Sequence, residues 1–300
     1  MKKLIKAIIC LSMAFGLLSI PALQASASQA TSYTYTLDED GYFTRTQDAY
    51  LPDRTITDLQ LNAPEDLYID QNNMLYIADS GNHRIVKYSI DKGEVVGILD
   101  DENLKNPRGV FVTSTGDIYV ADPTAKMVFK FDKDFNLVQS FGRPTSPSFA
   151  DTPYEPLRVA VDNGGNLYII GEGVYNGIIQ LSVAGDFLGY FTVNQTRLTF
   201  IQAIQNAIFT RAQLENLVSR VPTTFSNIFI DSKGIVYSTT MGSHRDALKK
   251  HDTAGGNMLK DAMIQSDSMT DIYVDNRGIM YSSIHEGYIE VFSSHGELIF

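Results

Sequence analysis

The segment from Leu75 to Ile85 has the sequence LYIADSGNHRI and follows a shorter apolar run, LYI, at Leu67–Ile69. Five residues separate the two runs, and the first four of them form a polar stretch, DQNN. Two apolar runs of strand length with a polar turn between them predict an antiparallel hairpin. The run RIVKY at Arg84–Tyr88 follows the turn-forming residues SGNH and predicts a third strand.

This arrangement recurs four more times along the chain. In each unit a tyrosine preceded by an apolar residue marks the second strand. These anchor tyrosines are Tyr76, Tyr119, Tyr168, Tyr237 and Tyr281. They are separated by 43, 49, 69 and 44 residues. A repeat of this length, built from short strands and polar turns, predicts the blades of a β-propeller.

The strands of each unit differ in composition. The first two are apolar at nearly every position, whereas the third alternates apolar and polar residues. This difference predicts that the first two strands are buried between neighbouring blades. A fourth strand is predicted at Glu94–Leu99 in the first unit and at Leu137–Phe141 in the second. We therefore expect an all-β fold, a β-propeller of four-stranded antiparallel blades, with five units visible over residues 60–300.

The fifth unit reaches Phe300 just as its fourth strand begins. An open ring would expose apolar blade faces and strand edges, which natural proteins avoid. We therefore expect further strands after Phe300 in the complete protein, which would be six-bladed. Residues 28–59 form an N-terminal segment, of which residues 41–59 could supply outer strands of the closing blade.

The chain resembles NHL-repeat proteins rather than propellers with a Trp-Asp signature, since it contains no tryptophan. The resemblance lies in Pro64–Tyr88 and is strongest at Leu75–Ile85. The second unit keeps IYVAD at Ile118–Asp122 but has Ala125–Met127 where the repeat has asparagine and arginine. Later units keep the strand pattern only. The resemblance implies a propeller scaffold whose rim contacts a protein, a peptide or a glycan.

The N-terminus has the features of a secretory signal peptide over residues 1–27. Lysines precede an apolar run from Leu4 to Leu23, and the small residues ASA at Ala25–Ala27 provide a cleavage site. An uncleaved membrane anchor is the alternative, although the run is barely long enough to span a bilayer. We expect a secreted protein, extracellular or associated with the cell wall, with no stable membrane span after cleavage.

Charge and cysteine content narrow the classes of partner. Cleavage after Ala27 removes three lysines and no acidic residue, so the formal net charge changes from −11 to −14. An acidic surface disfavours nucleic acid as a partner, because phosphates need a basic face. Cleavage also removes Cys10, the single cysteine, so the mature chain has no disulfide and no thiolate metal site. We expect a protein, peptide or glycan partner at the cell envelope.

The longest interval between anchors contains an insertion with helical character at residues 196–221. Apolar residues recur there three or four positions apart, which predicts amphipathic helices. The sequence TRAQ at Thr210–Gln213 has the form of a capping box. We therefore expect two short helices, at about 199–209 and 211–220, that form a helical hairpin. It would pack over one rim of the propeller or dock a partner.

Ligand sites in propellers usually lie where the first strands open onto the central channel. The corresponding residues lie ten and eleven positions before each anchor tyrosine. Those with charged or amide side chains are Glu65, Asp66, Arg108, Arg158, Asn227 and Asp271. The two arginines would bind a carboxylate, a phosphate or sugar hydroxyls in forked geometry. The alternative is a ring of mutually paired charges that keeps the channel hydrated.

The resemblance also implies an enzymatic alternative, because six-bladed relatives include calcium- or zinc-dependent lactonases. Glu65, Asn227 and Asp271 would be the available oxygen ligands for calcium, which could polarise an ester carbonyl. No serine elbow, phosphate loop or nucleotide fingerprint is present in the sequence. We predict a non-catalytic binding or scaffold module without a cofactor, and keep the metal-dependent hydrolase as the alternative.

Histidine ligands from separate blades could also hold zinc. The five histidines are His83, His244, His251, His285 and His295. Their offsets from the anchor tyrosines place them in turns and near outer strands, so they do not converge on the channel. Because a zinc site needs three ligands in one coordination sphere, we expect these histidines at the surface.

Overall fold

The computed structural model describes residues 33–51, 53–149, 151–192, 224–242, 247–259 and 266–300. The predicted signal peptide at 1–27 and helical hairpin at 196–221 lie outside these residues. One compact unit comprises Met1–Thr34 and Arg45–Arg54, and the other comprises Tyr35–Thr44 and Thr55–Phe300. In the part of the chain that the structure describes, no helix has the length and apolar character needed to cross a membrane.

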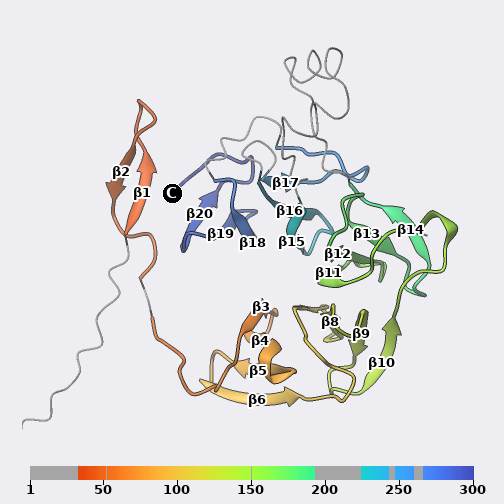
Figure 1. Ribbon diagram of the computed structural model, residues 1–300. Coiled ribbons are helices and arrows are strands. Elements are labelled where there is room, and N and C mark those ends of the chain that lie inside the picture. The colour runs from red at the N-terminus through yellow and green to blue at the C-terminus, as the bar shows by residue number, and fades with distance from the viewer. Residues whose placement is uncertain (1–32, 52, 150, 193–223, 243–246, 260–265) are drawn as a thin grey trace, which may run out of the picture. The chain divides into compact units, whose positions relative to one another are not determined.

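The second unit contains five antiparallel sheets, the blades, which follow one another along the chain (Figure 1). Blade 1 comprises β3 (Pro64–Ile69), β4 (Met74–Asp79), β5 (Arg84–Ser89) and β6 (Glu94–Leu99). Blade 2 comprises β7 (Gly109–Val112), β8 (Ile118–Asp122), β9 (Met127–Phe131) and β10 (Leu137–Phe141). Blade 3 comprises β11 (Pro156–Val161), β12 (Leu167–Gly171), β13 (Ile179–Leu181) and β14 (Phe187–Tyr190).

Blades 4 and 5 have three described strands each. Blade 4 comprises β15 (Thr224–Ile230), β16 (Val236–Met241) and β17 (Leu248–Lys250). Blade 5 comprises β18 (Met269–Val274), β19 (Met280–Ile284) and β20 (Tyr288–Phe292). Single bridges, His251 to Asn257 and Phe292 to Leu298, lie where a fourth strand would begin. The prediction of an all-β propeller with antiparallel blades is confirmed.

The N-terminal segment contains two described strands, β1 (Thr34–Leu37) and β2 (Phe43–Thr46). They pair with each other in a two-stranded sheet. Among the described residues, neither strand belongs to a blade sheet. The closing strands expected from residues 41–59, and the further strands expected after Phe300, stay predictions.

An aspartate begins the turn between the first and second strands in four blades. One carboxylate oxygen of Asp162 accepts the backbone N–H groups of Gly164 and Asn166, at 2.8 and 2.9 Å. The same pair of bonds is made by Asp70, Asp231 and Asp275. These bonds satisfy N–H groups that have no strand partner in the turn. The recurrent aspartate therefore sets the hairpin geometry of the blades.

Each blade has an aliphatic face and a tyrosine face. The aliphatic face of each blade carries one first-strand residue. Its partner on the second strand is the residue that directly follows the anchor tyrosine. These first-strand residues are Leu67, Val110, Val159, Ile228 and Ile272. The tyrosine face carries the anchor tyrosine itself, and it packs on the aliphatic face of the next blade. One core cluster, for example, joins Tyr76 and Ile85 of blade 1 with Val110 and Phe129 of blade 2.

Two of these faces are exposed in part. Leu67, on the aliphatic face of blade 1, is 58% exposed, whereas the equivalent residues of the other blades are at most 6% exposed. Ile289, on the tyrosine face of blade 5, is 62% exposed, whereas its counterpart Ile85 in blade 1 is 1% exposed. On the aliphatic face of blade 1, Ile77 and Val86 are buried in a cluster with Leu59, so only the first-strand part of this face contacts solvent.

Asp79, at the end of β4, is a fully buried polar centre in blade 1. Its carboxylate forms an ion pair with Arg84 at 2.8 Å. It also accepts hydrogen bonds from the Asn82 side chain at 2.8 Å and from the backbone N–H of Asn62 at 2.7 Å. Burial opposes ionisation, yet these donors hold the pKa of Asp79 below its ordinary value. The sequence ADSGNHR thus links the second and third strands to the segment before the blade.

Gly109, the first residue of β7, lies where β11 passes close to blade 2. A Cβ atom at this position would lie 2.6 Å from the carbonyl oxygen of Leu157 and 3.0 Å from the Cα of Arg158. Because both contacts are with backbone, Gly109→Ala is expected to push the two strands apart and to lower the free energy of unfolding by about 1–3 kcal/mol. Urea denaturation measures this change, and an unaltered midpoint would contradict it.

Candidate functional site

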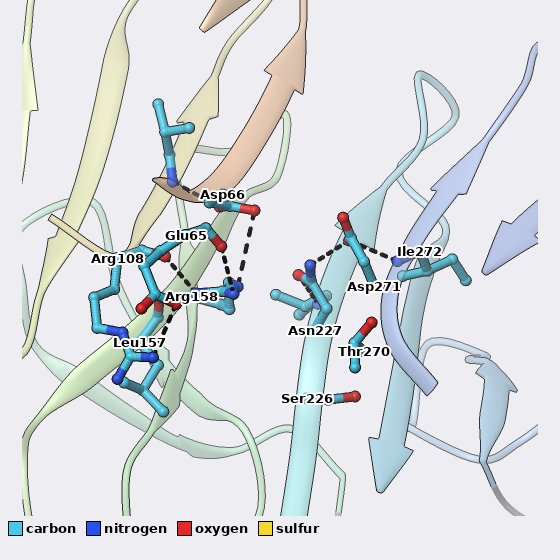
Figure 2. A network of polar contacts seen from close by, with 12 residues as sticks. Glu65, Asp66, Arg108, Leu157, Arg158, Ser226, Asn227, Thr270, Asp271 and Ile272 are labelled. Atoms are coloured by element: carbon cyan, nitrogen blue, oxygen red, sulfur yellow. Dashed lines mark hydrogen bonds and ion pairs between the residues drawn. The ribbon is translucent and has the colours of Figure 1, made fainter. Parts of the chain in front are cut away.

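Four of the six predicted site residues form one polar network on blades 1 to 3 (Figure 2). Arg108 Nη2 lies 2.9 Å from Glu65 Oε2 in an ion pair. Arg158 donates to the backbone carbonyl oxygens of Glu65 and Leu157, each at 3.0 Å, and also to that of Arg108. Its Nε lies 3.8 Å from Asp66 Oδ1. The two arginines therefore connect three successive blades.

Asn227 and Asp271 form a second group, on β15 and β18 (Figure 2). The Asn227 side chain donates to Asp271 Oδ1. The side-chain oxygens of both residues also accept the backbone N–H of the following residue, Ile228 or Ile272, each at 2.6 Å. The structure thus brings the six residues together as two groups, each held by contacts within the protein.

The two groups are coupled through buried carboxyl groups. Burial raises the pKa of Asp66 to about 7, an effect that Arg158 opposes and Asp271 increases. Burial also raises the pKa of Asp271, against the hydrogen bond from Ile272 and the charge of Arg158. Two buried carboxylates that repel each other favour protonation of one of them. Such carboxyl groups occur at functional sites and also in structural networks.

Asp66→Asn is expected to stabilise the protein at pH 8 by about 1–2 kcal/mol. The folded-state pKa near 7 lies above the ordinary value of 3.8. The stabilisation from the protonated carboxyl is therefore complete below about pH 4 and is lost as the pH rises through 7. Asparagine keeps an acceptor for the Val110 N–H, which Asp66 binds at 2.9 Å, and never ionises. Loss of the attraction to Arg158 offsets part of the gain.

The check on Asp66→Asn is urea denaturation of both proteins at pH 5 and pH 8. The variant should gain stability relative to the wild type between these two values. If the free energies of unfolding of variant and wild type differ by the same amount at both pH values, the raised pKa of Asp66 is contradicted.

The residues considered as calcium ligands do not fit that role in the described geometry. The Glu65 carboxylate is paired with Arg108, and the Asn227 amide nitrogen is directed at Asp271. Calcium requires several oxygen ligands around one point, without a competing cation beside them. Over residues 33–300, apart from the undescribed stretches, no group of three or more His, Cys, Asp or Glu side chains is placed to hold a metal ion.

His251 shows that the prediction of surface histidines was wrong for this residue. Its side chain is only 3% exposed. The imidazole Nε2 lies 2.8 Å from Ser238 Oγ and Nδ1 lies 3.1 Å from the Gly255 carbonyl oxygen. Burial lowers the pKa of His251 to about 4, so the ring is neutral at pH 7. The position of His251 relative to the anchor tyrosine Tyr237 could not show that the turn containing Gly255 covers the imidazole ring.

A second opening lies at the other ends of the same first strands. It is a cavity of about 820 Å³ lined by strand ends and the following turns of all five blades. Six aromatic residues line it, two of them the anchor tyrosines Tyr119 and Tyr237. The other four belong to first strands, namely Tyr68, Phe111, Phe229 and Tyr273. Each lies eight positions before an anchor tyrosine, and blade 3 has Ala160 there. The sequence analysis missed this position, although the recurrence of an aromatic residue was a signal for it.

The comparison with protein families matches the NHL repeat to residues 61–88. The chain is a β-propeller that carries an NHL repeat. The matched segment contains the buried centre formed by Asp79 and Arg84. The residues equivalent to Asp79 in blades 3 to 5 are Gly171, Thr240 and Ile284. Those blades therefore keep the strands of a propeller blade without the polar centre of blade 1.

The comparison with curated protein sequences found no match to this chain. Its fold is similar to that of streptogramin B lyase, with 12% identity, a TM-score of 0.51 and coverage of 81% of this chain and 69% of that one. A virginiamycin B lyase from Staphylococcus aureus, solved with quinupristin, gives 12% identity, a TM-score of 0.52 and coverage of 89% and 75%. The Cps50 (Swd1) propeller domain of Myceliophteria thermophila is 12% identical, with a TM-score of 0.52 and coverage of 81% of this chain and 68% of that one. At such identity the likeness shows the fold alone, and it does not separate catalysis from binding.

Proposed function

We propose that this NHL propeller is a non-catalytic binding module that acts outside the cell on a protein, peptide or glycan of the cell envelope. The observation that carries the proposal is the cavity of about 820 Å³ with its four first-strand aromatic side chains. Concave sites of this size, lined by aromatic rings and a few polar groups, are typical of ligand binding. Propeller strands hold such rings in fixed positions, so little ordering is needed when a ligand binds.

The opening predicted from the sequence is less suited to a ligand. Arg108 is paired with Glu65, and Arg158 donates to three backbone carbonyl oxygens. A ligand bound there would have to replace contacts that join blades 1, 2 and 3. We therefore assign this network a structural role and place the ligand at the aromatic cavity.

The extracellular location is part of the proposal and rests on the sequence. Residues 1–27 combine lysines, an apolar run and a small-residue cleavage site, as exported proteins do. The remaining chain lacks cysteine, so it would fold without disulfide formation. Its acidic charge is compatible with protein, peptide or neutral glycan partners.

A metal-dependent hydrolase of the lactonase type is the second candidate, and Asp66 is the observation that favours it. A carboxyl group with a pKa of about 7 is suited to general acid or base catalysis near neutral pH. However, Asp66 Oδ2 already accepts the Val110 N–H, and Asp271 Oδ1 already accepts two N–H groups. Neither carboxyl group is held ready for a substrate in this geometry.

Two assays on the full-length protein separate the candidates. The first measures hydrolysis of a δ-lactone and an aryl ester, with and without added calcium or zinc. We expect no turnover above the buffer control. The second measures retention of the wild type and of Phe229→Ala on immobilised envelope polymers and peptides, where the variant should be retained less. Metal-dependent turnover that Asp271→Asn abolishes would overturn the binding proposal in favour of the hydrolase.

A further inference from the structure

The charges around the aromatic cavity are of mixed sign, with five aspartates, three lysines and one arginine in its lining. Asp117 pairs with Lys130 at 3.0 Å, and Asp275 pairs with Arg277 at 2.8 Å. The other three lining aspartates are Asp70, Asp162 and Asp231. One oxygen of each accepts two turn N–H groups, and the other lies 3.3–3.5 Å from the hydroxyl of its anchor tyrosine. Because positive and negative side chains nearly balance in number, the lining has no cluster of one sign that would attract a strongly charged ligand.

The four first-strand aromatic side chains form two pairs, and the two rings of each pair come from neighbouring blades. Tyr68 and Phe111 have ring centroids 5.0 Å apart, and Phe229 and Tyr273 have centroids 5.5 Å apart, both in edge-to-face geometry. In such pairs one ring keeps a face that does not contact its partner. Tyr273 is 52% exposed. Within the described residues, the hydroxyls of Tyr68 and Tyr273 make no hydrogen bond, so both are available to a ligand.

Polar turn residues surround these rings. Asn163, Ser232 and Asn276 line the cavity and are exposed. Their amide and hydroxyl groups are neutral and both donate and accept hydrogen bonds. The cavity therefore combines apolar ring faces in its wall with neutral hydrogen-bonding groups at its rim. A ligand that suits it needs C–H faces, several hydroxyl or amide groups and no net charge.

We propose that the aromatic cavity binds a neutral oligosaccharide, an inference that rests on the proposed binding function and specifies its ligand class. A pyranose ring has one face of C–H groups with partial positive charge, which packs on the negative face of an aromatic ring. Its hydroxyls exchange hydrogen bonds with amides and tyrosine hydroxyls. Tyr273 and Tyr68 supply the ring contacts, and the turn residues at the rim supply the hydrogen bonds.

The test is a titration of the full-length protein with chitotriose and maltotriose, followed by calorimetry and by tyrosine fluorescence. The protein has no tryptophan, so tyrosine emission is observed directly. We expect saturable binding of at least one trisaccharide, weakened at least tenfold in Tyr273→Ala and in Tyr68→Ala. The matched control is Tyr175→Ala, because Tyr175 is 53% exposed and lies outside the cavity lining. It should bind like the wild type, and circular dichroism confirms that each variant is folded.

Further probes separate failure of this inference from failure of the proposed function. Trilysine, trigalacturonate and an uncharged tripeptide are titrated in parallel. If a peptide binds in a Tyr273-dependent manner and no neutral saccharide does, the saccharide inference is overturned and the binding function stands. If no probe binds and metal-dependent lactone hydrolysis is observed, both are overturned. Equal weakening by Tyr273→Ala and Tyr175→Ala would place the saccharide outside the cavity and overturn the inference.

Discussion

Asp79→Ala is expected to lower the free energy of unfolding by about 3–5 kcal/mol, because it removes one partner of a buried ion pair. The Asp79 side chain is fully buried, and its loss removes the carboxylate that accepts from Arg84, from the Asn82 side chain and from the Asn62 N–H. Arg84 and Asn82 keep their hydrogen bonds to the carbonyl oxygens of Leu59 and Gln60, so the loss comes from the missing carboxylate. Urea denaturation followed by circular dichroism measures the change.

Two further variants show whether the effect belongs to this polar centre. Asp122 occupies the equivalent position in blade 2 and accepts the N–H groups of Lys105 and Asn106, but Met127 stands where blade 1 has Arg84. Asp122→Ala should therefore cost less, about 1–3 kcal/mol. Asp134, whose side chain is 66% exposed, should tolerate alanine within about 0.5 kcal/mol. Similar losses for Asp79→Ala and Asp134→Ala would refute the assignment.

The strands were predictable because their signals are local. The turn aspartates, such as Asp162 and Asp231, bind N–H groups two and four residues later, so the sequence itself contains both partners. The anchor tyrosines mark second strands in all five blades. The blade order likewise follows from the repeat. What a residue contacts within its own hairpin could therefore be read from a single sequence.

The pairing at the candidate site depends on contacts between blades. Arg158 reaches the backbone oxygens of Glu65 and Arg108, which lie 93 and 50 residues earlier in the chain. Gly109 leaves the room beside β11 that this approach needs. The sequence predicted that these residues converge, but it left open whether the arginines face a ligand or one another. That choice depends on inter-blade distances, which have no local signal.

The last prediction compares the same substitution at equivalent positions of two blades. Ile228 and Leu67 both pair with the residue after the anchor tyrosine, but Ile228 is 6% exposed and Leu67 is 58% exposed. Ile228→Ala should lower the free energy of unfolding by about 2–5 kcal/mol, because it opens a cavity between blades 3 and 4. Leu67→Ala should change it by less than about 0.5 kcal/mol.

Urea denaturation of the two variants tests more than core packing. The Ile228→Ala result checks that one blade's tyrosine face packs on the aliphatic face of the next. The Leu67→Ala result checks whether the Leu67 side chain on the aliphatic face of blade 1 is exposed in solution. A loss at Leu67 as large as that at Ile228 would contradict the described exposure. It would mean that apolar surface covers this face, as the strands expected from a sixth blade would.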